Sequence, residues 1–332
     1  MATLHDVARK SGVSVATVSN VFTRKKYVSP ETHRKVKEVC HELNYKPNPI
    51  AASMITKKTG IIGLFLDTQK DVFHTMYPDL IKGVGLEAAH IGYSPLLFFN
   101  VSGKEDFSRL FVNKTHYIDG AIIISPQRDD FRINELLKDN IPFVVFGNPP
   151  ENLNVKVPYI DSPNEDDSYT LTTHLLSNGH SDILFLNNSE KITLGRDRAK
   201  GFKRAHEDNG IKINPELVFE ISGYHDVSEI LRAVDGKFTA CVVESNDSAR
   251  EVYKYAVAKG LEIGKNLAVV SLGGMKETFL PELTSVYVDF EEAGISAVKL
   301  LKEAWDKNIQ PHYIMGKSHI KISTSSDFTY GE

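Results

Sequence analysis

The sequence predicts a small all-α unit at the N-terminus followed by an α/β body of two doubly wound lobes. Within residues 1–46, apolar residues recur at helical spacing on either side of a glycine. From Gly60 onward, short apolar runs that are typical of strands alternate with helical stretches, which is the pattern of a parallel sheet covered by helices. The alternation occurs twice, before and after about residue 161, and this repetition indicates two similar lobes.

The first predicted helix is marked at both ends. Thr3 fits an N-cap, and Asp6, three residues later, completes a capping-box pattern. Gly12 can adopt the positive φ that ends this helix and turns the chain. One face of the helix carries residues spaced i, i+3, i+4 and i+7, which are Leu4, Val7, Ala8 and Ser11.

A second short helix follows the cap candidate Ser14, and its two sides differ. Val18, Val21 and Phe22 can point inward. The outer side is small and mostly polar, as in a recognition helix whose first residues meet base edges in the major groove. Two short helices around a glycine turn therefore predict a helix-turn-helix. The expected DNA contacts in this part of the chain are Thr3, Ser14, Val15, Ala16, Thr17, Ser19 and Asn20.

A third helix is indicated by Ser29 as N-cap and Pro30 at the first helical position. Its apolar stripe consists of Val36, Val39, Cys40 and Leu43. Residues 1–59 contain 11 Lys and Arg against 4 Asp and Glu, a net charge of +7, whereas the remainder contains 28 against 39, a net charge of −11. Any three-helix unit can show such stripes, and surplus Lys can simply be solvated. The caps, the turn glycine, the stripes and the charge together favour a DNA-binding headpiece.

The body shows eight strand-like runs and four clear helical stretches. The runs are Ile61–Leu66, Pro95–Phe99, Ala121–Ser125, Phe143–Phe146, Ile183–Leu186, Ala240–Val243, Ala268–Leu272 and Ser285–Val288. The helical stretches are Asp79–Ile91, Asp166–Asn178, Ala199–Asn209 and Ser248–Lys259. Ligands of open α/β sheets bind beyond the carboxyl ends of strands. We therefore expect a binding site at the loops that follow Leu66, Ser125, Phe146, Leu186, Glu244 and Leu272.

Several classes of protein are not favoured by the sequence. No apolar run precedes the headpiece as a secretory signal would, and no stretch reaches membrane-spanning length. Cys40 and Cys241 lie on apolar stripes and are expected to be buried free thiols of a cytoplasmic protein. No Cys/His cluster has metal-ligand spacing. Neither a dinucleotide-binding glycine motif, a P-loop nor a nucleophile elbow is present, so we expect neither an enzyme nor a cofactor.

The headpiece motifs resemble those of the LacI/GalR transcriptional regulators, and the resemblance runs through the whole chain. The matching motifs are Asp6-Val7-Ala8, Gly12-Val13-Ser14, Thr17-Val18-Ser19 and Leu43-Asn44-Tyr45-Lys46-Pro47-Asn48. The resemblance implies a cytoplasmic homodimer or pair of dimers, with no membrane partner. It also implies binding to a pseudo-palindromic operator in double-stranded DNA, controlled through a body that resembles periplasmic sugar-binding proteins.

The resemblance further implies a hinge helix within residues 47–59 that forms on operator DNA. In such a helix Met54 would take the place of the apolar wedge that enters the minor groove, with Ile55 beside it. Ala52 stands where relatives carry Arg, and Asn20 stands where many carry Arg or His, so the half-site preference is expected to be unusual. The alternative is that residues 47–59 form only a polar linker.

The implied domains follow from the same resemblance, with lobe crossings near Asp161, Asp289 and Ser323. The expected limits are 1–46 for the headpiece, 47–59 for the hinge, 60–332 for the body, about 60–161 plus 290–322 for the N-lobe, and about 162–289 plus 323–332 for the C-lobe.

The resemblance also implies a ligand cleft between the lobes. An Arg with aromatic rings suits a small polar ring such as a sugar, a sugar phosphate or a nucleobase. Each single match has a plainer alternative, because a lone Arg is often a surface residue and an Asn-Asp pair is often a helix cap. The expected ligand-binding residues are His74, Met76, Tyr77, Ser125, Asp161, Arg198, Tyr224, Asn246 and Gly273.

Gly273 departs from the family pattern, because relatives commonly carry a sugar-binding Asp there. Loss of this acceptor would cost a sugar about 1–3 kcal/mol. Three interpretations stay open: the effector is not a simple neutral sugar, Asp161 or Asp289 takes over, or no small molecule binds. Two rival functions also stay open, namely a binding protein with a vestigial headpiece and a regulator controlled by a docking phosphocarrier protein.

Overall fold

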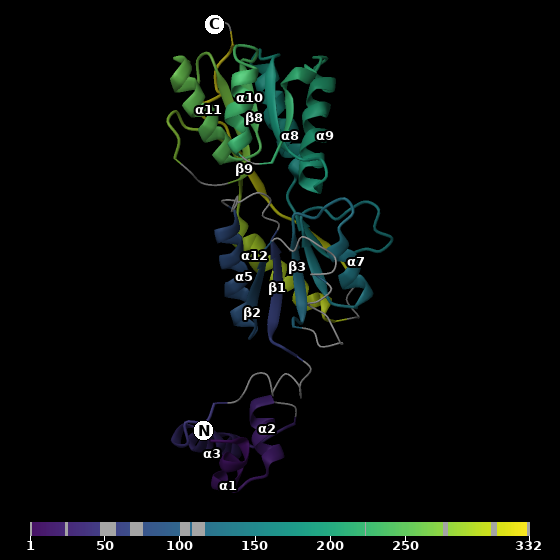
Figure 1. Ribbon diagram of the computed structural model, residues 1–332, viewed down its shortest axis with the longest axis vertical. Helices are drawn as coiled ribbons and strands as arrows, with labels where there is room; N and C mark the ends of the chain where they lie inside the picture. Colours follow the sequence, from purple (N-terminus) through teal and green to yellow (C-terminus); the bar gives the residue numbers. More distant parts are fainter. Residues whose placement is uncertain are drawn as a thin grey trace. The chain divides into compact units, whose positions relative to one another are not determined.

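The structure of the chain is a computed structural model, shown in Figure 1. It divides into two compact units, one made mostly of the residues up to Ile61 and the other of nearly all the rest. The residues that the structure describes are 2–23, 26–46, 58–66, 76–99, 107, 117–222, 224–274, 278–306 and 311–330. The expected hinge contacts Met54 and Ile55 lie outside this set.

The headpiece consists of α1 (Leu4–Ser11), α2 (Val15–Thr23) and α3 (Pro30–Glu42). The predicted capping box is confirmed: the backbone N–H of Thr3 donates to Asp6 Oδ2 at 3.0 Å, and that of Asp6 donates to Thr3 Oγ1 at 3.3 Å. The predicted stripes meet in a small core of Val7, Ala8, Val18, Val21, Val36, Val39 and Cys40. The predicted capping box and apolar stripes of the headpiece are therefore both present in the structure.

The turns of the headpiece also follow the sequence prediction. Gly12 ends α1 with a φ of 68°, in the left-handed region where glycine has no steric cost. Ser14 Oγ accepts the backbone N–H of Thr17 at 3.0 Å and so caps α2. Ser29 Oγ caps α3 by accepting the N–H of Thr32 at 3.2 Å. These caps satisfy amide groups that a helix start leaves without partners.

The N-lobe is built on a six-stranded sheet in the order β11-β5-β4-β3-β1-β2. Its strands are β1 (Ile61–Leu66), β2 (Ser94–Phe99), β3 (Gly120–Ile124), β4 (Phe143–Phe146), β5 (Tyr159–Asp161) and β11 (Tyr313–Met315). Its helices are α5 (Tyr77–His90), α7 (Phe131–Lys138) and α12 (Phe290–Ala304). Where pairing is described it is parallel, as in the register of Ile62 with Gly120.

The C-lobe has a corresponding strand order, β12-β10-β9-β8-β6-β7. Its strands are β6 (Ile183–Asn188), β7 (Val218–Ile221), β8 (Ala240–Val243), β9 (Ala268–Gly274), β10 (Thr284–Val288) and β12 (Ser318–Lys321). Its helices are α8 (Asn164–Ser177), α9 (Thr193–Asp208), α10 (Val227–Ala233) and α11 (Asn246–Lys259), with short 3-10 helices η3 (Pro215–Leu217) and η4 (Tyr224–Asp226). Only β12 is antiparallel to its described neighbour, β10.

Helices cover both faces of the C-lobe sheet, as the predicted doubly wound fold requires (Figure 1). Leu184 and Leu186 of β6 pack with residues of α10 and α11. Ile183 and Phe185 of the same strand pack with residues of α8 and α9 on the other face. This alternation within one fully buried strand explains why it reads as a continuous apolar run.

The chain passes between the lobes at three places. The first follows β5 at Asp161, and the second lies between β10 and α12 at Asp289, both near the expected positions. The third lies between Met315 of β11 and Ser318 of β12, earlier than the expected position near Ser323. The sequence did not predict a strand at β12, and therefore misplaced this crossing, because β12 is short and carries a single aliphatic residue, Ile320. No helix among the described residues is long and apolar enough to span a membrane.

Close packing of α5 against α12 gives a matched pair of substitutions. At Gly83 an added Cβ would collide with the backbone carbonyl of Glu291, whereas at Gly85 it would meet nothing within 4 Å. Gly83→Ala should therefore lower the free energy of unfolding by about 1–3 kcal/mol. Gly85→Ala should raise it by up to about 1 kcal/mol, because alanine favours the helix. Urea unfolding of both variants tests this, and equal effects would contradict the packing.

Candidate ligand cleft and DNA-binding face

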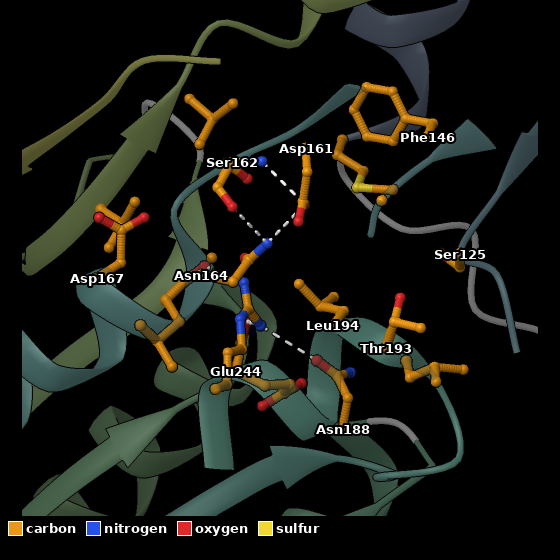
Figure 2. A pocket seen from close by; sticks show the side chains of 18 of the residues that line it. Ser125, Phe146, Asp161, Ser162, Asn164, Asp167, Asn188, Thr193, Leu194 and Glu244 are labelled. Atoms are coloured by element: carbon orange, nitrogen blue, oxygen red, sulfur yellow. Dashed lines mark hydrogen bonds between the residues drawn. The ribbon is translucent and has the colours of Figure 1, made fainter. Parts of the chain in front are cut away.

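A cavity of about 120 Å³, with room for several water molecules, lies between the two lobes (Figure 2). Residues at the carboxyl ends of strands from both sheets line it, as expected for this topology. The lining residues are Met76, Ser125, Pro126, Phe146, Gly147, Asp161, Ser162, Asn164, Asp167, Asn188, Ile192, Thr193, Leu194, Arg198, Glu244, Ser245, Leu272, Gly273, Val286, Val288 and Phe290.

Five of the nine predicted ligand-binding residues line this cavity, namely Met76, Ser125, Asp161, Arg198 and Gly273. Two others do not. Tyr77 is fully buried in the N-lobe core, and Asn246 is buried where it accepts a hydrogen bond from Ser271 Oγ at 2.8 Å. His74 and the side chain of Tyr224 lie outside the described part of the chain.

Arg198 lies inside α9, which begins at Thr193 and not at Ala199 as expected. Its terminal nitrogens donate to three oxygens at the ends of three neighbouring strands. The acceptors are Asn188 Oδ1 at 3.1 Å, the Glu244 carbonyl at 3.0 Å and the Leu272 carbonyl at 2.6 Å. Burial lowers the pKa of Arg198 to about 10, so it is charged at neutral pH. The guanidinium thus ties β6, β8 and β9 together beneath the cavity.

Gly273 leaves no space for the carboxylate that relatives carry. An added Cβ would lie 2.6 Å from the backbone nitrogen of Asn246 and 2.9 Å from Ser271 Oγ. Asp289, one proposed substitute, accepts the backbone N–H of Glu292 at 3.0 Å as the N-cap of α12 and does not line the cavity. Asp161, the other proposed substitute, does line it.

Three carboxylates line the cavity, and sequence reasoning missed two of them as site residues. Asp161 Oδ1 accepts the N–H of Ser162 and the amide of Asn164, each at 2.9 Å. Asp167 Oδ1 accepts from Ser318 Oγ at 2.7 Å. Glu244 Oε1 accepts hydroxyl hydrogens from Ser245 at 2.7 Å and from Ser248, in the first turn of α11, at 2.8 Å. The position of Glu244 directly after β8 was the available signal.

Burial dominates the electrostatics of these groups. It raises the pKa of Asp161 to about 7, with a smaller contribution from the nearby carboxylate of Asp197, against the hydrogen bond from Ser162 and the charge of Arg198. Burial likewise raises the pKa of Glu244, although two serine hydroxyls favour its charged form. The cavity is therefore a place where negative charge is costly unless a ligand compensates it.

The difference in free energy of unfolding between Asp161→Asn and the parent chain should increase with pH. The folded chain holds a proton on Asp161 that the unfolded chain releases between the ordinary pKa of 3.8 and about 7. The cost of the ionised carboxylate is therefore absent at low pH, grows as the pH rises and is complete above about pH 7. The advantage of Asp161→Asn over the parent should increase by about 2–3 kcal/mol between roughly pH 5 and pH 8. Chemical unfolding of both proteins across this pH range tests the prediction. A constant difference between their free energies of unfolding would contradict the burial of an ionisable Asp161.

One rim of the cleft is closed by contacts between the lobes. The backbone N–H of Thr193 donates to the Pro126 carbonyl at 3.2 Å, and that of Arg128 donates to the Lys191 carbonyl at 2.9 Å. Gln127 and Ile192 form an isolated antiparallel bridge between these bonds. A side-chain hydrogen bond also joins the lobes here: the Asn148 amide donates to Asp197 Oδ2 at 3.1 Å. The structure therefore represents the body with this rim closed.

The predicted DNA-contacting residues of the headpiece lie at its surface. None of them is buried: Thr3, Ser14 and Ala16 are exposed, and the others are partly exposed. Val18 and Val21, on the opposite side of α2, are buried. The residues concerned are Thr3, Ser14, Val15, Ala16, Thr17, Ser19 and Asn20. Their accessibility is what contact with base edges requires.

Comparisons with known proteins match both parts of the chain. The model of the bacterial regulatory proteins of the lacI family matches residues 3–48, and that of the periplasmic binding protein-like domain matches residues 172–321. Catabolite control protein A of Priestia megaterium is 27% identical over 326 residues, which is 96% of each chain. The ribose operon repressor of Halalkalibacterium halodurans is 29% identical over 92% of this chain and 91% of its own length.

Solved structures agree with these matches. The transcriptional regulator CelR in complex with cellobiose has 25% sequence identity and a TM-score of 0.71, over 98% of this chain and all of its own. The Lac repressor dimer bound to operator and an anti-inducer has a TM-score of 0.80 over 98% of this chain and 99% of its own, at 22% identity. The latter likeness shows the fold: an N-terminal helical domain followed by two α/β lobes.

Proposed function

The chain belongs to the LacI/GalR family of transcriptional regulators, and on this basis we propose that it is a repressor whose operator affinity is set by a small ligand in the interlobe cleft. The observation that carries the proposal is the presence in one chain of a basic helix-turn-helix unit and a two-lobed body with a polar cavity at its strand ends. The repressing sign follows the names of the relatives, such as the ribose operon repressor.

We propose that DNA is read by a homodimer in the cytoplasm. Two headpieces would contact the two halves of a pseudo-palindromic operator, each with the first residues of α2 in the major groove. The surface positions of Ser14, Thr17 and Asn20 support this assignment. Met54 and Ile55 would contact the minor groove from residues 47–59, with Met54 as the wedge.

Control would come from movement of the two lobes. A ligand that prefers one separation of the lobes shifts the population toward that state. Because residues 47–59 lie between the headpiece and β1, such a shift would change how the two headpieces of a dimer are spaced. Couplings of this type amount to about 1–3 kcal/mol, or roughly a 5- to 150-fold change in operator affinity.

Selection of binding sites from a random duplex library tests the proposal. The full chain should enrich a two-fold symmetric site, and a chain of residues 60–332 should enrich none. Added salt should weaken the binding steeply, because phosphate contacts release counterions. Failure of the full chain to enrich any site, with and without cell extract as a source of ligand, would contradict the proposal, as would specific binding by the truncated chain.

A further inference from the structure

We propose that the cleft ligand is a small organic cation, a protonated amine on an apolar body, held by the carboxylates of Glu244 and Asp161. This inference rests on the proposed function, because it names the chemical class of the molecule that occupies the same cleft. The observations that carry it are the excess of carboxylates over cationic groups among the described lining residues and an unpartnered buried carboxylate oxygen.

The charge balance of the described lining favours a cation. Three carboxylates line the cavity, whereas Arg198 is the single Lys or Arg among its described residues. In the part of the chain that the structure describes, Arg198 forms no ion pair within 4 Å with these carboxylates, although its charge favours the ionised form of each. A phosphate or carboxylate ligand would meet this excess of negative charge, and its burial would be strongly disfavoured.

Each lining carboxylate has one satisfied oxygen and one that accepts no hydrogen bond from the described residues. Serine hydroxyls or amide groups donate to Asp161 Oδ1, Asp167 Oδ1 and Glu244 Oε1. Glu244 is the sharpest case, because the residue is only 8% exposed and its Oε2 is buried without a partner. Buried polar atoms in native proteins almost always have a partner, so this oxygen indicates a missing donor.

Arg198 does not supply that donor, although its Nε is itself buried without a hydrogen-bond partner among the described residues. Both of its terminal nitrogens already donate to carbonyl or carboxamide oxygens at strand ends. The residue therefore acts as a structural brace of three strand ends, and its charge partly offsets the carboxylates.

The arrangement of the lining sets the shape of the ligand. Figure 2 shows Asp161, Ser162 and Asn164 on one side of the pocket, with Asn188 and Glu244 across from them. Much of the remaining wall is apolar, including Phe146 and Phe290, whose ring centroids are 6.5 Å apart. An ammonium group can donate up to three hydrogen bonds, so it can use carboxylate oxygens of the lining as acceptors, while an apolar body meets the rings.

The test uses the full chain and a series of alkyl and aryl primary amines. Each amine is compared with the alcohol and the carboxylate of the same carbon skeleton, such as benzylamine with benzyl alcohol and benzoate. Binding is measured by calorimetry and by the shift in melting temperature. We expect at least one amine to bind about tenfold or more tightly than its alcohol, and the carboxylates not to bind.

Variants locate the binding. Glu244→Gln should weaken amine binding about tenfold or more while changing alcohol binding little, because it replaces an acceptor of a charged donor by a neutral amide. Asp161→Asn should act in the same direction and serves if Glu244→Gln does not fold. Glu220→Gln, the same change at an exposed position outside the cavity, should have no effect.

Three results would overturn the inference: tighter binding of a carboxylate than of its amine, amine binding that neither Glu244→Gln nor Asp161→Asn weakens, and no binding of any amine at millimolar concentration. Site selection in the same preparation separates this failure from that of the proposed function. A chain that selects a symmetric operator but binds no amine refutes only the ligand class. A chain that binds amines in the cleft but selects no operator refutes the proposed function and leaves the ligand class standing.

Discussion

Replacement of Arg198 by Met should lower the free energy of unfolding by about 3–5 kcal/mol, the largest effect we expect from a single side chain in the body. The substitution removes the donors for the Glu244 and Leu272 carbonyls and for Asn188 Oδ1, all at strand ends. It also removes the positive charge of the single Lys or Arg among the described residues that line the cavity. Each carbonyl left without a donor adds to the cost because it remains shielded from water.

Arg204→Met is the matched control for this prediction, because Arg204 lies on the same helix. Its guanidinium pairs with Glu165 at 2.5 Å and Asp166 at 2.7 Å, but these groups are exposed to solvent. Exposed ion pairs contribute little, so the control should lose about 1 kcal/mol or less. Chemical unfolding of both variants decides the matter, and similar losses would mean that Arg198 is not a structural brace.

Replacement of Val36 by Asp should abolish specific DNA binding, with a loss of at least about 100-fold in affinity. Val36 is fully buried in the headpiece core, and it lies on α3, which carries none of the predicted DNA contacts. A buried, unpaired carboxylate costs more than so small a core can offset. The loss of binding would therefore come from unfolding of the headpiece, while the melting of the body stays unchanged.

Lys35→Gln separates charge from folding in this experiment. It changes the net charge by one unit in the negative direction, as Val36→Asp does, but at the exposed neighbouring position of the same helix. It should weaken binding only several-fold, through a lost phosphate attraction. Equal losses for the two variants in a binding titration at fixed salt would show that charge alone matters.

The headpiece is the part of the structure that the sequence predicts best. Its signals are local: Thr3 and Asp6 cap a helix within four residues of each other, and Gly12 supplies a turn that other residues adopt only with strain. The inward valines follow helical spacing, and the core forms where those stripes meet. Each signal needs no knowledge of distant residues, which is why the predicted and observed elements coincide.

The cleft is predicted only in outline, because its details depend on contacts between distant segments. The strand ends indicate where a cavity lies, but not that the donors of Arg198 are used by carbonyls of two strands more than 40 residues away. Tyr77 matches a family position, yet it points into the N-lobe core. Helix α9 begins at Thr193, six residues before its expected start. The sequence did not indicate this first part, because Gly195 and Arg196 are not apolar and so add nothing to a helical stripe.

At Gly273, too, the sequence predicts only part of what the structure contains. The sequence indicates that a carboxylate is missing from the usual position, and the structure adds that Asn246 and Ser271 occupy the space around it. The acceptors of this cleft come instead from Asp161, Asp167 and Glu244. The proposed ligand class therefore rests on the positions of several residues and not on one.

If the separation of the lobes sets operator affinity, a disulfide between residues 127 and 192, which bridge the closed rim of the cleft, should change that affinity. Gln127 and Ile192 face each other in an antiparallel bridge, a pairing whose Cα separation suits a disulfide. The natural thiols Cys40 and Cys241 are both buried. The double variant Gln127→Cys with Ile192→Cys can therefore hold the rim closed when oxidised and release it when reduced.

The measurement is the operator affinity of this double variant in its oxidised and reduced forms, with the parent chain under both conditions as the control. We expect operator affinity to differ by about 5- to 150-fold between the two forms of the variant, and not to differ for the parent. Identical operator affinities for the locked and unlocked forms, with the disulfide confirmed by mass spectrometry, would contradict control of DNA binding through the cleft.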